Sequence, residues 1–176
     1  MSTIRLTTPL GETTARSLRA GDRVLLSGVI WTGRDQAHKR LVALLDEGKE
    51  LPCDLRDQVI YFVGPCPAMP GRPIGSAGPT TSGRMDAYSP RLMADCRLRG
   101  MIGKGARNAA VNDAMRQYGA VYFAATGGAG ALIAQCVKQC DLVAFPDLGP
   151  EAIYRLVVED FPLVVATDST GATLYR

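Results

Sequence analysis

The sequence predicts one α/β domain spanning residues 1–176, and three observations lead to this prediction. A chain of 176 residues suits a single domain with a core of useful size. Short apolar runs typical of buried strands alternate with segments whose apolar residues recur at helical spacing. Near the end of the chain, two strand-like runs follow one another with no helix between them, which indicates a partly antiparallel section.

The expected strands are short and mostly apolar. Ile4 and Leu6 alternate with polar neighbours, as on an edge strand. The other strands are expected at residues 23–31, 59–63, 99–103, 121–125, 153–158 and 163–167. After the last strand, residues 168–171 should form a hairpin-like return that leads into residues 173–175.

The expected helices carry apolar residues on one face. They are predicted at residues 34–47, 86–96 and 106–118, and from the Gly127-Gly128-Ala129-Gly130 segment through Cys140. Gly48 and Gly119 stand where the first and third of these helices should end, because glycine accepts the backbone conformation that follows a helix.

Residues 66–83 form the most unusual segment. They include four prolines and four glycines, which exclude a long helix or a central strand. Long loops in compact domains are usually functional or disordered. This one contains little Lys or Glu and leads to Thr80-Thr81-Ser82, which argues against a disordered linker.

Composition and charge exclude several classes of protein. A net charge of +3 and an aromatic content of 6 % argue against a protein that binds nucleic acid or an anionic membrane surface. The first ten residues hold no apolar signal core, and no apolar run approaches the roughly 18 residues of a membrane span. We therefore expect a cytoplasmic protein that binds neither nucleic acid nor membrane.

The five cysteines are an odd number and are expected to be reduced thiols. Cys136 and Cys140 are four residues apart, so on a helix they would share a face. No second cysteine pair accompanies them, as it would in most metal sites. We expect them to be small buried residues and not metal ligands.

Motifs of self-contained enzymes are missing from the sequence, which contains no H-E-x-x-H and no G-x-S-x-G. A Walker A loop would need glycine and a hydroxyl residue at the positions of Leu98 and Gly105. Ile133 stands where a dinucleotide fingerprint starting at Gly128 would need a small residue. With a single histidine, a Ser–His or Cys–His enzyme is weakly supported.

Three cations stand where the backbone changes direction. Arg34 lies at a strand-to-helix switch, Arg84 follows the Pro/Gly-rich segment, and Lys104 lies between two glycines at the end of a strand. In open α/β sheets, ligands gather beyond the carboxyl ends of strands, where such loops converge. The set suits a small dianion, because Arg binds carboxylates bidentately and Lys acts as a point charge.

A plainer interpretation stays open for each of these residues. Surface Arg and Lys are commonly just solvated. Residues 78–81 could form a turn that caps the next helix, and His38 suits an ordinary helix position. The set also lacks an obvious general acid or base, because a threonine hydroxyl does not ionise near neutral pH without strong help. Any reaction at this site would therefore need a partner.

Four motifs resemble the class I fumarase and tartrate dehydratase family, over essentially the whole chain. The segment Gly78-Pro79-Thr80-Thr81-Ser82-Gly83-Arg84-Met85-Asp86 closely resembles the family signature. Gly33-Arg34-Asp35-x-x-His38 and Gly103-Lys104-Gly105 look like two further family motifs, and Val158-Glu159-Asp160-Phe161-Pro162 is similar to the fumarase C-terminus. The match corresponds to the β subunit of two-chain enzymes, or to the C-terminal domain of single-chain ones.

The resemblance implies a fold, a partner and a cofactor. The fold would be a swivelling β/β/α domain. A separate α subunit would carry a [4Fe–4S] cluster on three cysteines, so the five cysteines here would not be cluster ligands. The two chains would form a heterotetramer of two α and two β subunits, and the isolated chain could form a homodimer.

The resemblance also implies roles for four residues. Arg34, Arg84 and Lys104 would hold the substrate carboxylates, and Thr80 would be the base for the proton at C3. The iron would act as the Lewis acid that draws off the substrate hydroxyl. The cations would stabilise the aci-carboxylate that forms when the proton leaves.

Within the family, Gly83, Asp86 and the segment 158–162 look more like fumarases than tartrate enzymes. The expected reaction is therefore the interconversion of fumarate and (S)-malate by a hydro-lyase of the tricarboxylic acid cycle. Tartrate, or a mesaconate/citramalate pair, is the alternative substrate. A non-catalytic binding or assembly domain with the same fold is the alternative of another class, and the presence of Arg34, Arg84 and Lys104 argues against it.

Overall fold

The computed structural model describes residues 2–125 and 129–176. Its strands are β1 (Ile4–Thr7), β2 (Arg23–Thr32), β3 (Val59–Tyr61), β4 (Gly100–Gly103), β5 (Val121–Ala124), β6 (Val137–Ala144) and β7 (Ile153–Thr167). Its α-helices are α1 (Glu12–Ser17), α2 (Asp35–Asp46), α3 (Ser89–Cys96), α4 (Ala109–Tyr118) and α5 (Gly130–Cys136). Two 3₁₀ helices, η1 (Ser82–Met85) and η2 (Pro146–Glu151), complete the described elements.

The strands form one mixed sheet in the order β1-β2-β3-β4-β5-β7-β6, with an additional pairing of β2 to β7. Neighbours from β1 to β5 are parallel, whereas β7 runs antiparallel to β2, β5 and β6. The extra pairing joins β2, β3, β4, β5 and β7 into a closed ring, so β1 and β6 are the outer strands. This confirms an α/β fold with an antiparallel section near the end of the chain, while the swivelling-domain assignment stays a prediction.

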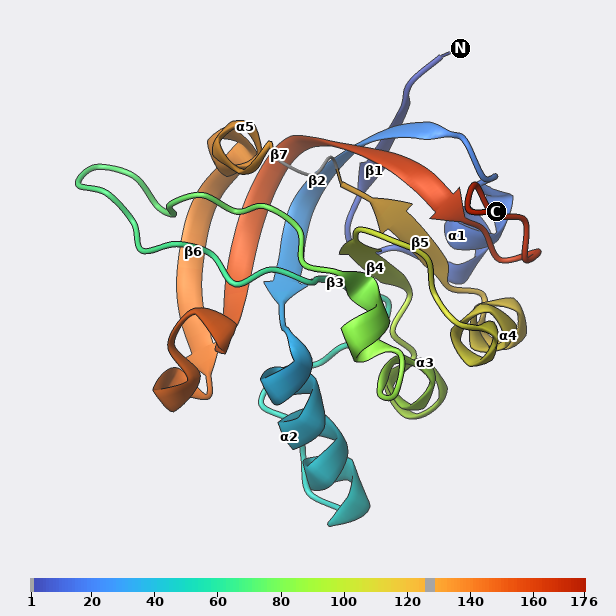
Figure 1. Cartoon of the computed structure of the whole chain (residues 1–176), viewed down its shortest axis with the longest axis horizontal. Helices are drawn as coiled ribbons and strands as arrows, with labels where there is room; N and C mark the ends of the chain where they lie inside the picture. Colours follow the sequence, from blue (N-terminus) through green and yellow to red (C-terminus); the bar gives the residue numbers. More distant parts are fainter. Residues whose placement is uncertain (1, 126–128) are drawn as a thin grey trace.

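Successive residues of the central strands face two different cores, as the pleat of a strand requires. In β3, Val59 and Tyr61 pack into a core that also contains residues of α1 and α5, whereas Ile60 packs into a core beneath α2, α3 and α4. Figure 1 shows these three helices together on one side of the sheet, away from the long curved strands β6 and β7. Full burial of each large side chain contributes roughly 1.5–3 kcal/mol.

Most predicted elements are confirmed, with small shifts at their ends. The strands expected at residues 23–31, 59–63, 99–103 and 121–125 are β2 to β5, and the helices expected at 34–47 and 106–118 are α2 and α4. The helix expected at 86–96 begins later, at Ser89, because η1 and a turn occupy residues 82–88 and Pro90 stands in its first turn. The return after β7 is also present, since Thr167 pairs with Thr173.

Two predictions near the end of the chain were wrong. The helix expected to run through Cys140 ends at Cys136, and residues 137–144 form β6 instead, because this segment pairs with the first half of β7. Cys136 and Cys140 therefore do not share a helix face, and both are half-buried and not fully buried. The two late strands are one strand, β7, which bends at Asp160 with a positive φ of 50°. The Gly127-Gly128 pair lies outside the described residues.

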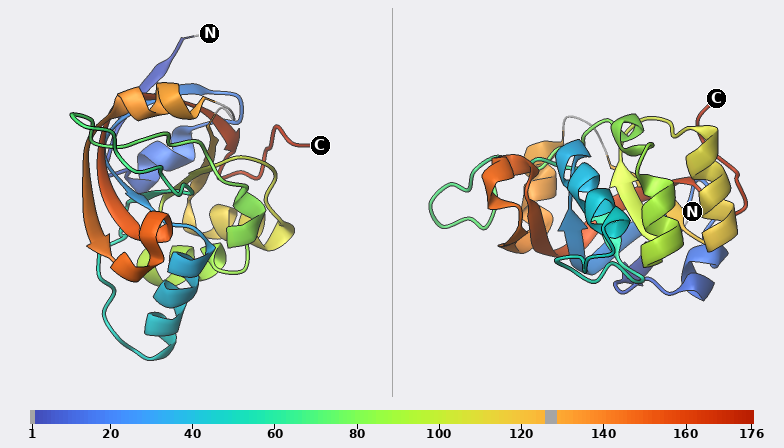
Figure 2. Two further views of the ribbon diagram at one scale, coloured as in Figure 1. Left: turned by 60° about the vertical axis from the view of Figure 1, so that its left-hand side comes forward. Right: turned by 90° about the horizontal axis from the view of Figure 1, so that it is seen from below.

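Residues 64–81, which include most of the Pro/Gly-rich segment, form a long loop that is fastened at its base. Cys66 and Ser76 pair across it, since the Cys66 N–H donates to the Ser76 carbonyl at 2.9 Å. The Tyr61 hydroxyl donates to the carbonyl of Ala77 at 2.5 Å, and Ile74 is buried. Figure 2 shows the tip of this loop projecting beyond the rest of the molecule. The loop therefore has a fixed base next to the sheet and an exposed tip at residues 66–73.

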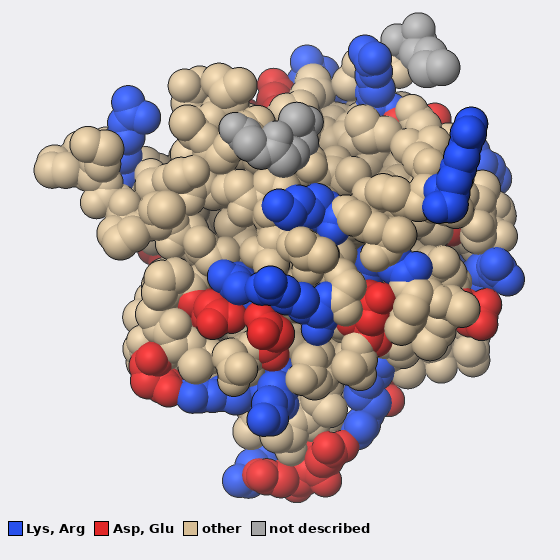
Figure 3. Space-filling view, in the orientation of Figure 1, with Lys and Arg blue, Asp and Glu red and all other residues tan. Residues whose placement is uncertain are grey.

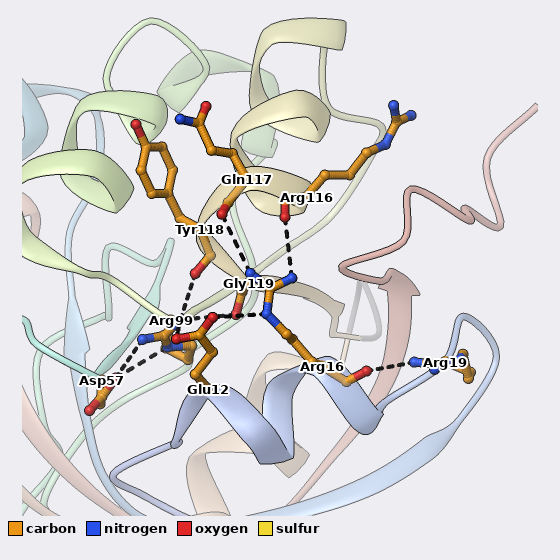
Figure 4. Close-up of polar contacts among 9 residues, drawn as sticks. All are labelled: Glu12, Arg16, Arg19, Asp57, Arg99, Arg116, Gln117, Tyr118 and Gly119. Carbon is orange, nitrogen blue, oxygen red and sulfur yellow. Dashed lines mark hydrogen bonds and ion pairs between the residues drawn. The ribbon is translucent and has the colours of Figure 1, made fainter.

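An arginine network lies at the edge of the sheet where the parallel strands begin (Figure 4). Arg99 is 5 % exposed and donates to the Asp57 carboxylate at 2.8 Å and to the Tyr118 carbonyl at 2.6 Å. Arg16 of α1 donates to Glu12 at 2.9 Å and reaches the last carbonyls of α4. These bonds satisfy the C-terminal carbonyls of α4 and hold α1 against it.

No helix within residues 2–125 and 129–176 has both the length and the apolar character needed to span a membrane.

Candidate functional site

The predicted site residues follow the carboxyl ends of neighbouring parallel strands. The sheet register sets Thr32 beside Tyr61, and Tyr61 beside Ile102. Arg34 follows Thr32 by two residues, and Lys104 follows Ile102 by two residues. Both cations therefore begin at the same level of one sheet edge, which is the edge where ligands bind in α/β folds.

Residues 80–82 return to this edge and lie beside Lys104. The Thr80 N–H donates to the Phe62 carbonyl at 2.7 Å, and the Lys104 N–H donates to the Thr80 carbonyl at 3.3 Å. The Ser82 N–H donates back to the Lys104 carbonyl at 2.9 Å, and Thr81 forms a parallel bridge with Lys104. The end of the long loop thus adds a short extra strand that joins Thr80 and Lys104 through their backbones.

Arg34 stands just before α2, and its guanidinium lies in a half-buried acidic niche. Its Nε is 3.5 Å from Glu151 Oε1 and 3.9 Å from Asp35 Oδ1. All three atoms are buried and have no hydrogen-bond partner among the described residues. Gly64 forms one wall, because a Cβ there would lie 3.2 Å from both Cδ and Nη1 of Arg34. The Nε–H of this arginine is therefore close to two carboxylates without being hydrogen-bonded to either.

Arg84 lies in η1 and is exposed. Its positive charge acts on the carboxyl group of Glu151, the last residue of η2. Burial raises the pKa of the Glu151 carboxyl group and so does nearby Asp35, whereas the positive charges of Arg34 and Arg84 lower it. Two of the three predicted cations therefore face one carboxyl group, although they come from different segments of the chain.

The arrangement of basic groups is visible on the surface. Figure 3 shows Lys and Arg side chains gathered across the middle of one face, close to where α2 begins and where the long loop meets η1, with acidic side chains directly beside them. Lys104 is exposed, and so is Arg84. The face therefore presents cations to solvent with carboxylates behind or beside them.

Glycine is required at Gly103 for a steric reason. A Cβ at this position would overlap Ser82 Oγ and lie 2.9 Å from Phe62 Cδ2. Gly105, on the other side of Lys104, has a φ of +86°, which L-residues rarely adopt. The two glycines that flank Lys104 thus let the η1 segment pack directly on the end of β4.

A buried ion pair that the sequence reasoning missed supports the signature segment from below. Arg107 has a fully buried side chain and donates to Asp86 Oδ1 at 2.6 Å and to Ser89 Oγ at 2.7 Å. The other Asp86 oxygen accepts the backbone N–H of Asn108 at 2.9 Å. Asp86 is part of the signature and one of the features that favour a fumarase, but nothing in its spacing from Arg107 indicates the pair. The pair fixes the segment after η1 to the loop that follows Lys104.

His38 is a buried helix residue. Its Nδ1 lies 2.7 Å from the Arg34 carbonyl, and its ring packs edge-on against Phe62. Burial lowers the pKa of the imidazole to about 4, so the ring is neutral at pH 7. The proton therefore sits on Nδ1, which donates to the carbonyl, and this supports the plainer interpretation of the residue as part of the helix packing.

All five cysteines of this chain are free thiols. No group of three or more Cys, His, Asp or Glu side chains that could hold a metal ion occurs among residues 2–125 and 129–176. Cys53 lines a hollow of about 520 Å³ near the ends of α2 and α3, away from the four predicted residues. Burial raises the pKa of this thiol to about 12, which disfavours the thiolate that a metal requires.

The model of the family described as "Fumarase C-terminus" matches residues 1–176. The chain therefore belongs to this family, in agreement with the resemblance of its motifs. It is 43 % identical over 155 residues to "Fumarate hydratase class I, anaerobic" of Escherichia coli, a match that covers 88 % of this chain and 28 % of the relative. A relative from Leishmania major, "Fumarate hydratase 2", is 37 % identical over 156 residues, with 88 % and 28 % of the two chains covered.

A third relative has a length close to that of this chain. It is a Methanocaldococcus jannaschii protein named, provisionally, as L(+)-tartrate dehydratase subunit beta. The two are 39 % identical over 166 residues, which cover 92 % of this chain and 85 % of the relative. The chain thus spans about 28 % of the length of the fumarate hydratases quoted above, but most of a protein named as a subunit.

Proposed function

We propose that this chain is the β subunit of a two-subunit, [4Fe–4S]-dependent fumarate hydratase that interconverts fumarate and (S)-malate, and that it holds the substrate carboxylates. The observation that carries the proposal is that Arg34, Arg84 and the Lys104–Thr80 backbone pair meet at one edge of the sheet, on a chain of the Fumarase C-terminus family. The names of the fumarate hydratase relatives support the reaction, and the name of the M. jannaschii relative supports the division into subunits.

Each cation has a distinct task in this proposal. Arg34 binds one substrate carboxylate through its terminal nitrogens, because its Nε side already faces Glu151 and Asp35. Arg84 and Lys104 are exposed and neutralise the remaining charge of the dianion. Cations fixed in this way also stabilise the extra negative charge that develops on a carboxylate when the proton at the adjacent carbon is removed.

Thr80 is the proposed base for the proton at C3. Its backbone is held on both sides, by the Phe62 carbonyl and by the Lys104 N–H, so its side chain starts from a fixed position. A threonine hydroxyl is a weak base by itself. The positive charges of Lys104 and Arg84 favour the alkoxide, and the partner subunit completes the environment in which Thr80 loses its proton.

The partner in this proposal is an α subunit that carries the cluster, and the name of the M. jannaschii relative, a subunit beta, supports such a division. When bound there, the cluster supplies Lewis-acid assistance to departure of the hydroxyl group. The chain described here binds and orients the dianion and takes the proton. We propose a cytoplasmic heterotetramer of two α and two β subunits, with a homodimer for the isolated chain, and with all of residues 1–176 forming one swivelling β/β/α domain.

L(+)-tartrate is the second candidate substrate, because the relative that matches this chain over most of its own length carries that name. Mesaconate is a further four-carbon-backbone alternative that the same cations could hold. A non-catalytic assembly domain is the alternative of another class, and the buried support beneath the cationic loops argues against it, since Arg107 and Gly103 hold those loops in place.

The test is anaerobic reconstitution of this chain with its α subunit, which we expect to be encoded beside it as a protein with three cluster-binding cysteines. We expect hydration of fumarate by the reconstituted complex and by neither chain alone. Turnover by the isolated, metal-free chain would contradict the proposal. Turnover of tartrate or mesaconate by a complex that leaves fumarate unchanged would replace the substrate, while keeping the subunit assignment.

A further inference from the structure

Glu151 is a carboxylate built into the cationic site. Its Oε1 is 3.5 Å from Arg34 Nε, and its side chain is 29 % exposed. The charged groups that face it are Arg34 and Asp35 at the start of α2, and Arg84 in η1. Glu151 is thus close to Arg34 and feels the positive charge of Arg84, which are two of the cations that we assign to the substrate.

The backbone holds Glu151 in this place by specific contacts. The Thr32 hydroxyl donates to the carbonyl of Ala152 at 3.3 Å and accepts the N–H of Tyr154 at 3.0 Å. Thr32 ends β2 two residues before Arg34, so one buried side chain fixes both the segment that carries Glu151 and the segment that carries Arg34. The Tyr154 hydroxyl also donates to the Gly149 carbonyl at 3.1 Å, which steadies the kink of η2. Glu151 is therefore positioned against Arg34 by the fold.

Glu151 Oε1 lies close to Arg34 Nε, but the two atoms form no hydrogen bond. Neither Glu151 Oε1 nor Arg34 Nε has a hydrogen-bond partner among the described residues, although both atoms are buried. Asp35 Oδ1 is in the same condition and lies on the same side of the guanidinium. A substrate carboxylate that forms paired hydrogen bonds with an arginine is a stronger partner than an ion at this distance and geometry. Glu151 therefore repels an incoming dianion by its charge, but it does not form the paired hydrogen bonds with Arg34 that a substrate carboxylate could form.

We propose that Glu151 is a place-holding carboxylate that partners Arg34 and Arg84 when no substrate is bound and that weakens the binding of dicarboxylates by its negative charge. This inference rests on the proposed function of the same site. With Arg34, Arg84 and Lys104 charged and with Asp35 and Glu151 ionised, the site has a net charge of 3 − 2 = +1. A dianion brings this to −1, whereas removal of the Glu151 charge would leave the occupied site neutral.

The test is Glu151→Gln in the reconstituted two-subunit complex, with succinate as a non-reacting dicarboxylate probe. Calorimetry would measure succinate binding, and steady-state kinetics would measure KM and kcat for fumarate. We expect the Kd for succinate and the KM for fumarate to fall roughly three- to tenfold, as the loss of one like charge at a partly solvated site predicts. Binding should also lose part of its pH dependence, because protonation of Glu151 relieves the same repulsion in the wild-type complex.

Two variants keep the result interpretable. Asp147→Asn removes the same charge from the same 3₁₀ helix, but Asp147 is paired with Arg40 at 2.8 Å on the surface, so succinate binding should not change. Glu151→Asp keeps the charge, so its Kd should stay much nearer to the wild-type value than that of Glu151→Gln, unless the fold itself is altered. Thermal melting of all three complexes shows whether the fold is retained.

The outcomes separate this inference from the proposed function. Tighter succinate binding by Glu151→Gln without turnover of any diacid would support the place-holder and refute the hydratase. Turnover of fumarate with an unchanged or weaker Kd for succinate in Glu151→Gln would overturn the place-holder alone. Failure of the wild-type complex to bind succinate at all would overturn the place-holder as well, because the cations would then not form a dicarboxylate site.

Discussion

Gly103→Ala is predicted to destabilise the chain and to disorder the region around Thr80 and Arg84. The new methyl group would overlap Ser82 Oγ and lie 2.9 Å from the ring carbon Cδ2 of Phe62, which is fully buried. Overpacking of a close-packed interior costs about 1–3 kcal/mol. Displacing Ser82 would also break its 2.7 Å hydrogen bond with the Tyr122 hydroxyl, at a net cost of about 0.5–1.5 kcal/mol.

Together these effects amount to a loss of about 1.5–4.5 kcal/mol in the free energy of unfolding. For a domain of this size, that corresponds to a fall of about 3–18 °C in Tm. Thermal and urea unfolding of the purified chain, followed by circular dichroism, would measure both quantities. In the reconstituted complex, we also expect a higher KM for fumarate, because Lys104 and Thr80 depend on the same packing.

A matched control is available at Gly83, which lies in η1, the segment that packs on Gly103. A Cβ at Gly83 would meet no atom within 4 Å, so Gly83→Ala should unfold like the wild type. The double variant Ser82→Ala/Gly103→Ala should recover part of the loss, because the nearest overlapping atom is removed while the Phe62 contact remains. A Gly103→Ala chain that melts within about 1 °C of the wild type would refute the steric argument.

Two further predictions concern single side chains. Arg84→Ala should lower kcat/KM of the complex for fumarate by about 10²–10³-fold. Its Tm should be unchanged, because the side chain is exposed. Arg72→Ala, which changes an exposed arginine of the long loop, is the control, and equal losses of kcat/KM in both variants would count against a site role for Arg84. The buried His38, with its pKa lowered to about 4, should make the chain less stable as pH falls from 6.5 towards 4, because the unfolded state then binds the extra proton. Its contribution amounts to a loss of about 2 kcal/mol at pH 5 relative to pH 7, measured by urea unfolding, and a His38→Gln variant with an equally steep pH dependence would contradict this assignment.

Local patterns were sufficient for the elements whose residues alternate or repeat strongly. The parallel strands β2 to β5 were predicted because each is a short apolar run bounded by turn residues, and α2 and α4 because their apolar residues share one face and glycine follows them. The long loop was predicted because proline and glycine exclude regular structure there. The order of these elements also located the cations at strand ends, since a parallel strand must be followed by a crossover that starts at the same edge.

Local sequence patterns were not sufficient to predict the strand β6. Residues 137–144 contain no clear strand alternation, and most of them are solvent-exposed. They form a strand because β7 offers an unpaired edge, so the deciding interaction lies outside the segment. Pairing with β2 on both sides of Asp160, at Val158 and at Phe161, makes β7 continuous where the local sequence suggested a break.

The sequence alone determined the class of fold, the family and the positions of Arg34, Thr80, Arg84 and Lys104 at loops, because these depend on local composition and on motifs that are contiguous in the chain. The roles of these four residues stay predictions, of which the Arg84→Ala variant tests one directly. Only the tertiary structure decided what stands next to them: Glu151 against Arg34, Asp86 on buried Arg107, and Ser82 packed on Gly103. Each of these contacts joins residues far apart in the chain, and no local periodicity encodes which distant side chain will fill a given space.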